Sequence, residues 1–338
     1  MRDLAKRLLY SSGALGLYHR IKNAGSLTVV MFHRVIDRED PRWHVCDPDY
    51  TLERRVFADS LRFFRRHYNV VSHDEVLHAR MAGVPLPPRA LLITFDDGWA
   101  DNADFALPEL KRAGLPAHMF VVSDVVGRRQ PFFQERIVSA FRRGALRVGE
   151  LAAVLPARGE GEGMALGEDL DALREVIARL EALGREERET LLLPFAAALD
   201  DGMRHMVDIE DLRALMDGGV TLGLHGATHT WMTRVEDLDA ELGGAREALR
   251  RQLEGAPPAA DSMSFPYGAH TPEIARRALE AGYRLVMTSV PVLNPGDSPG
   301  WLLGRIGFDT GTVVDAAQRF RPDLLALYLF RRGIQPLA

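Results

Sequence analysis

Cysteine is nearly absent from this sequence, in which Cys46 is the one cysteine among 338 residues. A lone cysteine cannot form a disulfide within the chain or supply a cluster of thiolates, so a disulfide scaffold and a zinc finger are excluded. Any bound metal must therefore be held by histidine, aspartate or glutamate. Because this cysteine usage suits a reducing compartment, we expect the protein to be cytoplasmic.

Long apolar runs are also missing. No stretch approaches the roughly 18 to 20 apolar residues that cross a bilayer. The start of the chain alternates leucines with basic residues and lacks the uninterrupted apolar core of a signal peptide. We predict an N-terminal amphipathic helix over residues 1–25, which either packs on the protein or makes peripheral contact with a membrane surface.

Neither sign of charge dominates, since 42 Lys and Arg face 47 Asp and Glu for a net charge of −5. A mildly acidic chain has no global electrostatic reason to bind nucleic acid, and we expect no such partner. Hydrophobic residues make up 46% and charged residues 26%, which excludes wholesale disorder. The length allows two domains of about 150 residues or one large α/β domain.

Short apolar runs recur along the chain, each followed by polar residues and then by a helical pattern. This order is typical of βα units and of an α/β fold. From about residue 128 to 205 the pattern changes to consecutive helices, including stretches over 168–183 and 186–199, which predicts a helical insertion. The predicted strands cover residues 27–32, 91–95, 119–122, 220–224, 263–265, 284–287 and 304–307.

Polar side chains follow three of these strands. The first ends at His33, the second at Asp96 and Asp97, and the fourth at His225. In a barrel of parallel strands the carboxyl ends converge on one face, so these residues can share a site although they are remote in sequence.

The residue types at these strand ends suit a metal. His225 and His229 are four residues apart, a spacing that on a helical turn places both imidazoles on one face. Asp96 and Asp97 are adjacent, so one can bind a metal while the other faces substrate. One carboxylate and two imidazoles suit zinc, iron, cobalt or nickel, with positions left for water and substrate. An isolated Asp-Asp-Gly turn or His pair is more often incidental, and it is their coincidence at strand ends that favours a site.

Three segments carry a family resemblance. Thr94-Phe95-Asp96-Asp97-Gly98, then His225-Gly226-Ala227-Thr228-His229, then Phe265-Pro266-Tyr267-Gly268 resemble, in order, the first three motifs of the polysaccharide deacetylases of carbohydrate esterase family 4, the nodulation-type chitooligosaccharide deacetylase group. The resemblance covers roughly residues 26–310 and includes an Asp-Asn pair shortly after the first motif. It implies a distorted (β/α) barrel of about seven parallel strands, with residues 26–338 as the catalytic domain.

The resemblance also implies roles for individual residues. Asp97, His225 and His229 would hold a divalent metal, for which we expect Zn²⁺ ahead of Co²⁺, Ni²⁺ or Fe²⁺. Asp96 would be the general base that takes a proton from water, and the backbone N–H of Tyr267 would stabilise the oxyanion that forms on the acetyl carbonyl.

The sequence departs from the family pattern at two places. The arginine that usually precedes the third motif is replaced by Ser264, and we expect Arg305 to take its place as the partner of Asp96. The late Leu-x-His motif is absent, since no histidine follows His270. In members of the exopolysaccharide-biosynthesis type the general acid lies on an early strand, so His33 is our candidate acid, with a structural role at the strand end as the alternative.

Aromatic side chains beside the motifs are candidates for sugar binding. Trp99 and Trp231 could stack against a pyranose ring, although core or rim packing would explain either one equally well. The remaining residues expected to contact substrate come from the third motif and are Phe265, Pro266 and Gly268.

These features together predict a metal-dependent hydrolase that removes N-acetyl groups, breaking a non-peptide carbon–nitrogen bond. The expected partner is an acetylated amino sugar in a polysaccharide, an oligosaccharide or a lipid-linked glycan. The alternatives are a carbohydrate O-acetyl esterase, a hydrolase of a non-sugar amide, and a non-catalytic sugar-binding protein on the same fold. The sequence makes no prediction of oligomeric state.

Overall fold

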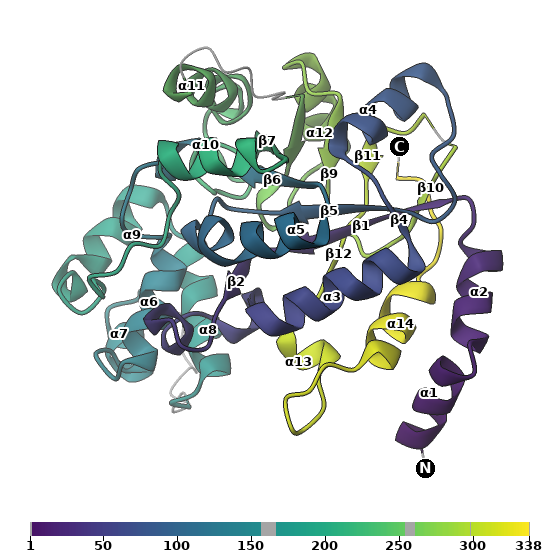
Figure 1. Ribbon diagram of the computed structural model, residues 1–338. Helices are drawn as coiled ribbons and strands as arrows, with labels where there is room; N and C mark the ends of the chain where they lie inside the picture. The colour runs from purple at the N-terminus through teal and green to yellow at the C-terminus, as the bar shows by residue number, and fades with distance from the viewer. Residues whose placement is uncertain (1, 157–166, 254–260, 298, 338) are drawn as a thin grey trace. The chain divides into compact units, whose positions relative to one another are not determined.

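The computed structural model describes residues 2–156, 167–253, 261–297 and 299–337 (Figure 1). The chain divides into two compact units. Unit 1 comprises Met1–Asp37, Pro48–Arg128 and Met206–Ala338, and unit 2 comprises Arg38–Asp47 and Arg129–His205. Part of the expected insertion, residues 157–166, lies outside the described residues.

Unit 1 is built on a mostly parallel sheet. Its strand order is β10-β1-β5-β6-β7-β8-β9-β11, with β12 paired to β1 and β4 paired to β5. Among the strand pairs of the described residues in this sheet, only β1–β10 is antiparallel. The strands are β1 (Ser26–Phe32), β4 (Asn69–Val70), β5 (Ala90–Phe95), β6 (Ala117–Val121), β7 (Val220–Leu224), β8 (Ser262–Ser264), β9 (Leu285–Met287), β10 (Asn294–Pro295), β11 (Leu302–Leu303) and β12 (Ile306–Gly307).

The sheet closes almost completely into a barrel. β11 pairs with β9 at one end of the path, and β12, which follows β11 after Gly304 and Arg305, pairs with β1 at the other. The fold is thus the distorted (β/α) barrel that the family resemblance implied. Arg305 sits in the short connection where the barrel closes. A separate two-stranded sheet pairs β2 (Arg34–Ile36) with β3 (Thr51–Glu53).

Alternation along the strands divides the hydrophobic core of unit 1 in two. On β1, Leu27 and Val29 belong to one buried cluster, whereas Val30 and Phe32 belong to another. β5 follows the same period of two, as side chains on a pleated strand must. The sequence of each strand is therefore an almost continuous apolar run, which is typical of parallel strands covered on both faces.

Helices connect the strands and cover the sheet (Figure 1). The predicted capping box at the start of α4 is present, with Ser72 and Glu75 exchanging hydrogen bonds, and Gly114 ends α5 in the left-handed conformation. The helices of this part are α3 (Arg54–His67), α4 (His73–Ala82), α5 (Leu107–Ala113), α10 (Ile209–Asp217), α11 (Ala245–Gln252), α12 (Pro272–Glu280), α13 (Thr310–Val313) and α14 (Pro322–Phe330).

The N-terminal segment forms two helices where we expected one. α1 spans Arg2–Ser11 and α2 spans Ala14–Lys22. The break has a local cause, because Gly13 adopts φ +81° and the hydroxyls of Ser11 and Ser12 donate back to the carbonyls of Leu8 and Leu9. Among the described residues, no helix combines the length and apolarity needed to cross a membrane.

Unit 2 has a hydrophobic core of its own. Its helices are α6 (Phe133–Arg142), α7 (Val148–Ala153), α8 (Leu170–Glu181) and α9 (Arg185–Leu192). The helix expected over residues 186–199 ends at Leu192, where Pro194 removes a backbone donor and a short 3₁₀ turn follows. The contribution of residues 38–47 to this unit was not expected from the sequence.

Candidate metal centre

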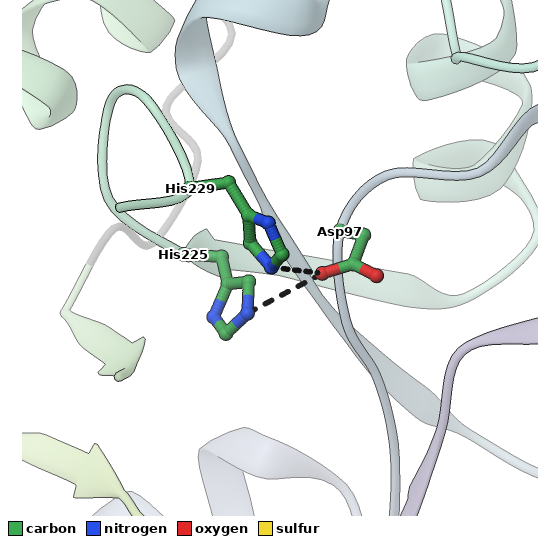
Figure 2. Close-up of side chains that lie close together, drawn as sticks. All are labelled: Asp97, His225 and His229. Carbon is green, nitrogen blue, oxygen red and sulfur yellow. Dashed lines mark ion pairs between the residues drawn. The ribbon is translucent and has the colours of Figure 1, made fainter. Parts of the chain in front are cut away.

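Three side chains from distant parts of the sequence converge at the carboxyl end of the barrel. Asp97, His225 and His229 each offer a ligand atom, and these atoms lie within 4.8 Å of one another. The Asp97 Oδ1 atom is 3.3 Å from His225 Nε2 and 3.2 Å from His229 Nε2. Figure 2 shows both imidazoles facing this single carboxylate oxygen.

The backbone at this point is irregular, and the predicted helical turn is wrong. Residues 225–230 form a loop in which Gly226 has φ +76° and His229 has φ +58°. The two histidines therefore meet because the loop turns back on itself. A Cβ atom on Gly226 would lie 2.9 Å from both a Glu241 oxygen and a Met232 carbon, so only glycine fits there.

Glu241 holds this loop from the other side of the turn. Its side chain is 6% exposed and accepts hydrogen bonds from the backbone N–H groups of Ala227 and Thr228, and from the Thr228 hydroxyl. A buried carboxylate bound by three donors fixes the segment that carries His229. Sequence reasoning missed Glu241, because nothing local marks an acid thirteen residues downstream as a loop anchor.

The second oxygen of Asp97 is held by Trp99, whose indole Nε1 donates to Oδ2 at 2.9 Å. Trp99 is only 2% exposed and lies under the Arg34 guanidinium, 4.4 Å from the ring centroid. The prediction that Trp99 forms a sugar-stacking platform is therefore wrong, since neither face of its ring reaches solvent. Trp99 orients the carboxylate, as residues behind metal ligands commonly do.

The Asp101–Asn102 pair fixes the end of β1. Asp101 accepts from Arg34 Nε at 2.9 Å and from the backbone N–H of Val35 at 3.0 Å, and Asn102 donates to the carbonyl of His33 at 2.9 Å. The Arg34–Asp101 ion pair is buried, with both side chains at most 1% exposed. The pair was visible in the sequence beside the first motif, but its partners come from the neighbouring strand.

The hydrogen bonding of His225 tests whether a cation fits this site. Its Nδ1 lies 2.9 Å from the Ser264 carbonyl oxygen, which can only accept, so Nδ1 carries the proton. Burial lowers the pKa of His225 to about 4, against the opposing effect of Asp96 and Asp97, so the ring is neutral near pH 7. Its Nε2 then presents a lone pair to Asp97 Oδ1, and two acceptors at 3.3 Å repel unless a cation lies between them.

The distances agree with that interpretation. Zinc bonds to imidazole and carboxylate are about 2.0–2.2 Å long, which places tetrahedral ligands roughly 3.3–3.6 Å apart. The measured separations are 3.2 and 3.3 Å. Asp97 Oδ1 is buried and has no hydrogen-bond partner in the described part of the chain. Although burial opposes ionisation, the nearby His229 holds the pKa of Asp97 well below its usual range.

Asp96 has an entirely different partner from its neighbour. Arg305 binds it with two parallel hydrogen bonds of 2.6 and 2.7 Å. The guanidinium is 1% exposed and also donates from Nε to the Thr288 carbonyl. Burial alone would raise the pKa of Asp96, but the charge of Arg305 outweighs it and the pKa lies below its ordinary value. The structure thus places Arg305 against Asp96, as expected for the residue that replaces the arginine missing from the third motif.

Ser264 occupies the remaining space between the two halves of the site. Its Oγ donates to Asp96 Oδ1 at 3.3 Å and lies beside His225 Nδ1. The nearest approach of Asp96 to the histidines is 4.0 Å, from Oδ2 to His225 Nε2. An ionised carboxylate therefore lies next to the three converging ligands without joining them.

The comparisons agree with this geometry. The family model for polysaccharide deacetylases matches residues 83–152, which include both aspartates. A protein of Bacillus subtilis (strain 168), YxkH, whose name provisionally assigns it as a polysaccharide deacetylase, is 34% identical over 56 residues. That match covers 17% of this chain and 20% of the relative. Over the segment that carries both aspartates, the chain is therefore similar to polysaccharide deacetylases.

Solved structures of similar fold include further deacetylases. The Streptococcus pyogenes deacetylase PplD, in complex with acetate, aligns with a TM-score of 0.57 and 13% identity over 90% of this chain and 99% of that one. IcaB from Ammonifex degensii aligns with a TM-score of 0.52 and 18% identity over 91% of this chain and 98% of that one. At these identities the likeness establishes the barrel fold.

The third motif forms the rim of the site. Phe265 is fully buried and stacks on His270, and Pro266 is buried too, so the expectation that these side chains contact substrate is wrong. Tyr267 has φ +59° and is 36% exposed. Gly268 follows with φ +68°, and a Cβ there would lie 1.9 Å from Ser289 Oγ, so the turn cannot carry a side chain at this position.

Trp231 is the half-buried aromatic residue of this rim. Its ring stacks on Tyr267 at 5.1 Å, and the Arg234 guanidinium lies 4.6 Å from its centroid. Its indole nitrogen is buried and has no hydrogen-bond partner among the described residues. Of the two tryptophans expected near the substrate, Trp231 alone stays a candidate.

His33 lies at the carboxyl end of β1, half-buried, with its ring edge-on to Tyr50 at 5.2 Å. It lines a cavity of about 160 Å³ together with Asp49, Tyr50, Phe308 and Asp309. His33 thus follows β1 at the carboxyl end of the sheet, the same end at which Asp97 follows β5.

Proposed function

We propose that this chain is a metal-dependent deacetylase that hydrolyses the N-acetyl group of an amino sugar within a glycan. One observation carries the proposal. Asp97, His225 and His229 converge on one point, and the adjacent carboxylate of Asp96 is held ionised by Arg305 without joining them. The unprotonated Nε2 of His225 facing a buried carboxylate oxygen supports a cation between them.

The residues present fit the metal on the tests of tautomer, spacing and donor type, and Asp97, His225 and His229 would hold it. A divalent metal in such a site acts as a Lewis acid and lowers the pKa of water. Asp96 is placed to accept the proton from that water, because Arg305 keeps it deprotonated at neutral pH. The N–H of Tyr267, on the strained turn of the third motif, is assigned to the developing oxyanion.

His33 is assigned the second proton transfer. An amine is a poor leaving group unless it is protonated, and an imidazole titrates in the range where it can donate. The position of His33 at the carboxyl end of β1, where it lines the cavity, supports this role. This arrangement favours an N-acetyl over an O-acetyl substrate, because an alkoxide leaves with less help than an amide nitrogen.

The substrate class follows from the family and the departures from its pattern. Arg305 binds Asp96 in place of the missing third-motif arginine, and we assign the role of the missing late histidine to His33, as in members of the exopolysaccharide-biosynthesis type. We therefore propose an acetylated amino sugar in a polysaccharide, oligosaccharide or lipid-linked glycan as the partner, and Zn²⁺ as the metal.

The decisive experiment measures acetate release from a panel of N-acetylated and O-acetylated glycans and lipid-linked sugars, with and without a chelator. We expect release from N-acetyl substrates that stops with chelator and returns with added Zn²⁺. Asp97→Asn or His229→Ala should lose bound metal, whereas Asp96→Asn should keep the metal and lose turnover. Equal loss of metal in all three variants would contradict the division of roles between the two aspartates.

A second measurement isolates the role of His33. His33→Ala should slow cleavage of an amide much more than cleavage of an activated acetyl ester, whose leaving group needs no proton; a general acid is typically worth about 10²–10⁴-fold in rate. Equal slowing of the two substrates would argue against His33 as the acid and for a structural role.

A further inference from the structure

The N-terminal helix α1 packs on unit 1 through its polar side. Asp3 accepts hydrogen bonds from Arg321 at 2.9 and 3.1 Å, and Tyr10 lies 3.1 Å from His67 and packs against Phe63. α1 and α2 both contact α14. Figure 1 shows them, in purple, running beside the yellow α14.

The leucines of α1 face away from these contacts. Leu4 is 62% exposed, Leu8 is 58% exposed and Leu9 is 47% exposed. At 3.6 residues per turn, Leu4 and Leu8 lie one above the other, and Leu9 extends the same apolar side. The helix therefore has the reverse of the usual orientation, with polar groups turned to the protein and leucines turned to solvent.

α2 also carries apolar side chains on its exposed side. Its inward residues, Leu15 and His19, are buried, whereas Leu17 is 58%, Tyr18 42% and Ile21 72% exposed. We call the exposed set the N-terminal apolar face; it consists of Leu4, Leu8, Leu9, Leu17, Tyr18 and Ile21. These are six of the thirteen large exposed hydrophobic side chains in the described part of the chain.

The charges around this face are almost all positive. Lys6 and Arg7 belong to α1, and Arg20 and Lys22 belong to α2. The one acidic residue of the two helices, Asp3, is paired with Arg321 and Arg7. This local excess of positive charge runs against the net charge of −5 of the whole chain.

We propose that the N-terminal apolar face is a docking surface for an anionic lipid bilayer, on which α1 and α2 lie in the interface without crossing it. Exposed leucine and isoleucine side chains suit the acyl region, and flanking lysine and arginine side chains suit lipid phosphates. Because the inward side already holds both helices in place, docking needs no coupled folding. The charge complementarity selects an anionic leaflet over a neutral protein surface, and the argument does not depend on the proposed enzymatic activity.

Vesicle flotation with the full chain tests this surface. Wild type is expected to float with vesicles of phosphatidylglycerol and phosphatidylcholine and to stay behind with phosphatidylcholine alone. Leu4→Gln, Leu8→Gln and Ile21→Gln combined should abolish flotation, since glutamine keeps the helix propensity but not the apolar surface. A matched control, Met81→Gln with Leu193→Gln, changes exposed apolar residues elsewhere (59% and 69% exposed) and should bind like wild type.

The charge requirement has its own pair of variants. Arg20→Gln with Lys22→Gln should weaken binding to anionic vesicles about 30-fold, whereas Arg250→Gln with Arg251→Gln, on exposed α11 positions, should have little effect. Circular dichroism and metal binding should be unchanged in all variants, which separates lost docking from misfolding.

Three outcomes would overturn the proposal. The first is equal binding of wild type to neutral and anionic vesicles, and the second is unchanged flotation of the variant that carries Leu4→Gln, Leu8→Gln and Ile21→Gln. The third is a wild type that does not bind vesicles but forms a dimer, together with a variant that is monomeric. The last result would assign the face to a second copy of the chain.

Discussion

Asp96 and Asp97 are chemically identical neighbours that the fold places in opposite environments. Asp97 faces two imidazoles and the indole of Trp99, whereas Asp96 faces a guanidinium. The turn after β5 separates them, since Asp97 has φ +78° and Gly98 has φ +88°. Aspartate tolerates this left-handed conformation better than most residues, so the motif can turn directly after a buried strand.

Arg305 is predicted to act as a positioning residue for Asp96. Arg305→Ala should raise the pKa of Asp96, because the charge that lowers it is gone. A general base must be deprotonated, so the acid limb of the pH–rate profile should move to higher pH, while bound metal is retained. Breaking this buried pair should also cost about 3–5 kcal/mol of stability.

Arg305→Lys is the matched variant for that measurement. Lysine keeps the positive charge but cannot make two parallel hydrogen bonds to Asp96. The acid limb of the pH–rate profile should therefore return most of the way to its wild-type position, with a lower maximal rate. An unshifted pH profile in Arg305→Ala would mean that Arg305 serves folding only.

Trp99 is predicted to tune the metal through Asp97. Trp99→Phe removes the Nε1 donor and leaves most of the apolar contact, so metal affinity should fall about 10–100-fold. Calorimetric titration with Zn²⁺ measures this. Trp301→Phe, at a half-buried tryptophan outside the site, is the control. The same affinity in both variants would show that the hydrogen bond to Asp97 contributes nothing.

At the scale of elements, the site is built by loops that follow regular strands. β5 and β7 bring Asp97 and His225 to one edge, but the loop of residues 225–230 brings His229 back toward them. That loop has no regular secondary structure, and Glu241 satisfies its backbone donors. The buried apolar residues of β5 and β7 thus place Asp97 and His225. His229 is placed by Glu241, a side chain from a later segment.

Glu241→Gln is predicted to loosen this loop. The charged acceptor of three hydrogen bonds is lost, which should cost about 1–3 kcal/mol. Hydrogen exchange at Ala227 and Thr228 should speed up, and metal affinity should drop because His229 is less well placed. Glu247→Gln on α11 is the control, since Glu247 is exposed and contacts Arg251 alone among the ion pairs of the described residues. If the backbone amides of Ala227 and Thr228 exchange as slowly in Glu241→Gln as in wild type, Glu241 does not anchor the loop.

At the scale of the molecule, the barrel gathers residues separated by more than a hundred positions in the chain. The parallel path from β1 to β11, closed through β12, places every strand end of the site on one face. Arg305 reaches Asp96 because it lies at the closure itself. Ligand binding to such an assembled site stabilises only the folded chain.

Metal is therefore predicted to raise the melting temperature. Zn²⁺ at 100 times its dissociation constant should add about 2.7 kcal/mol of stability. Scanning calorimetry of chelator-treated protein, before and after adding Zn²⁺, measures the shift. Below about pH 4 the shift should shrink, because protons then compete with the metal for His225, whose pKa is about 4. Asp97→Asn should show no comparable shift, and a full shift in that variant would place the metal elsewhere.

Most of the regular elements could be predicted from the sequence, because their signals are local. Apolar runs marked β1, β5 and β7, and capping residues marked the start of α4 and the end of α5. The predictions that were wrong concern places where tertiary contacts override local pattern. The helical spacing of His225 and His229 did not produce a helix, and Trp99 and Phe265 are buried in the folded chain although each lies beside a motif.

The order of residues along the chain by itself determined which side chains could meet, since continuous apolar runs favour parallel strands and polar groups follow their ends. Only the tertiary structure decided which role each side chain takes. Whether a carboxylate faces imidazoles or a guanidinium depends on partners more than a hundred residues away, and Trp99 is covered by Arg34 from the segment after β1. Such partners meet only after the barrel closes, because burial and charge act through space.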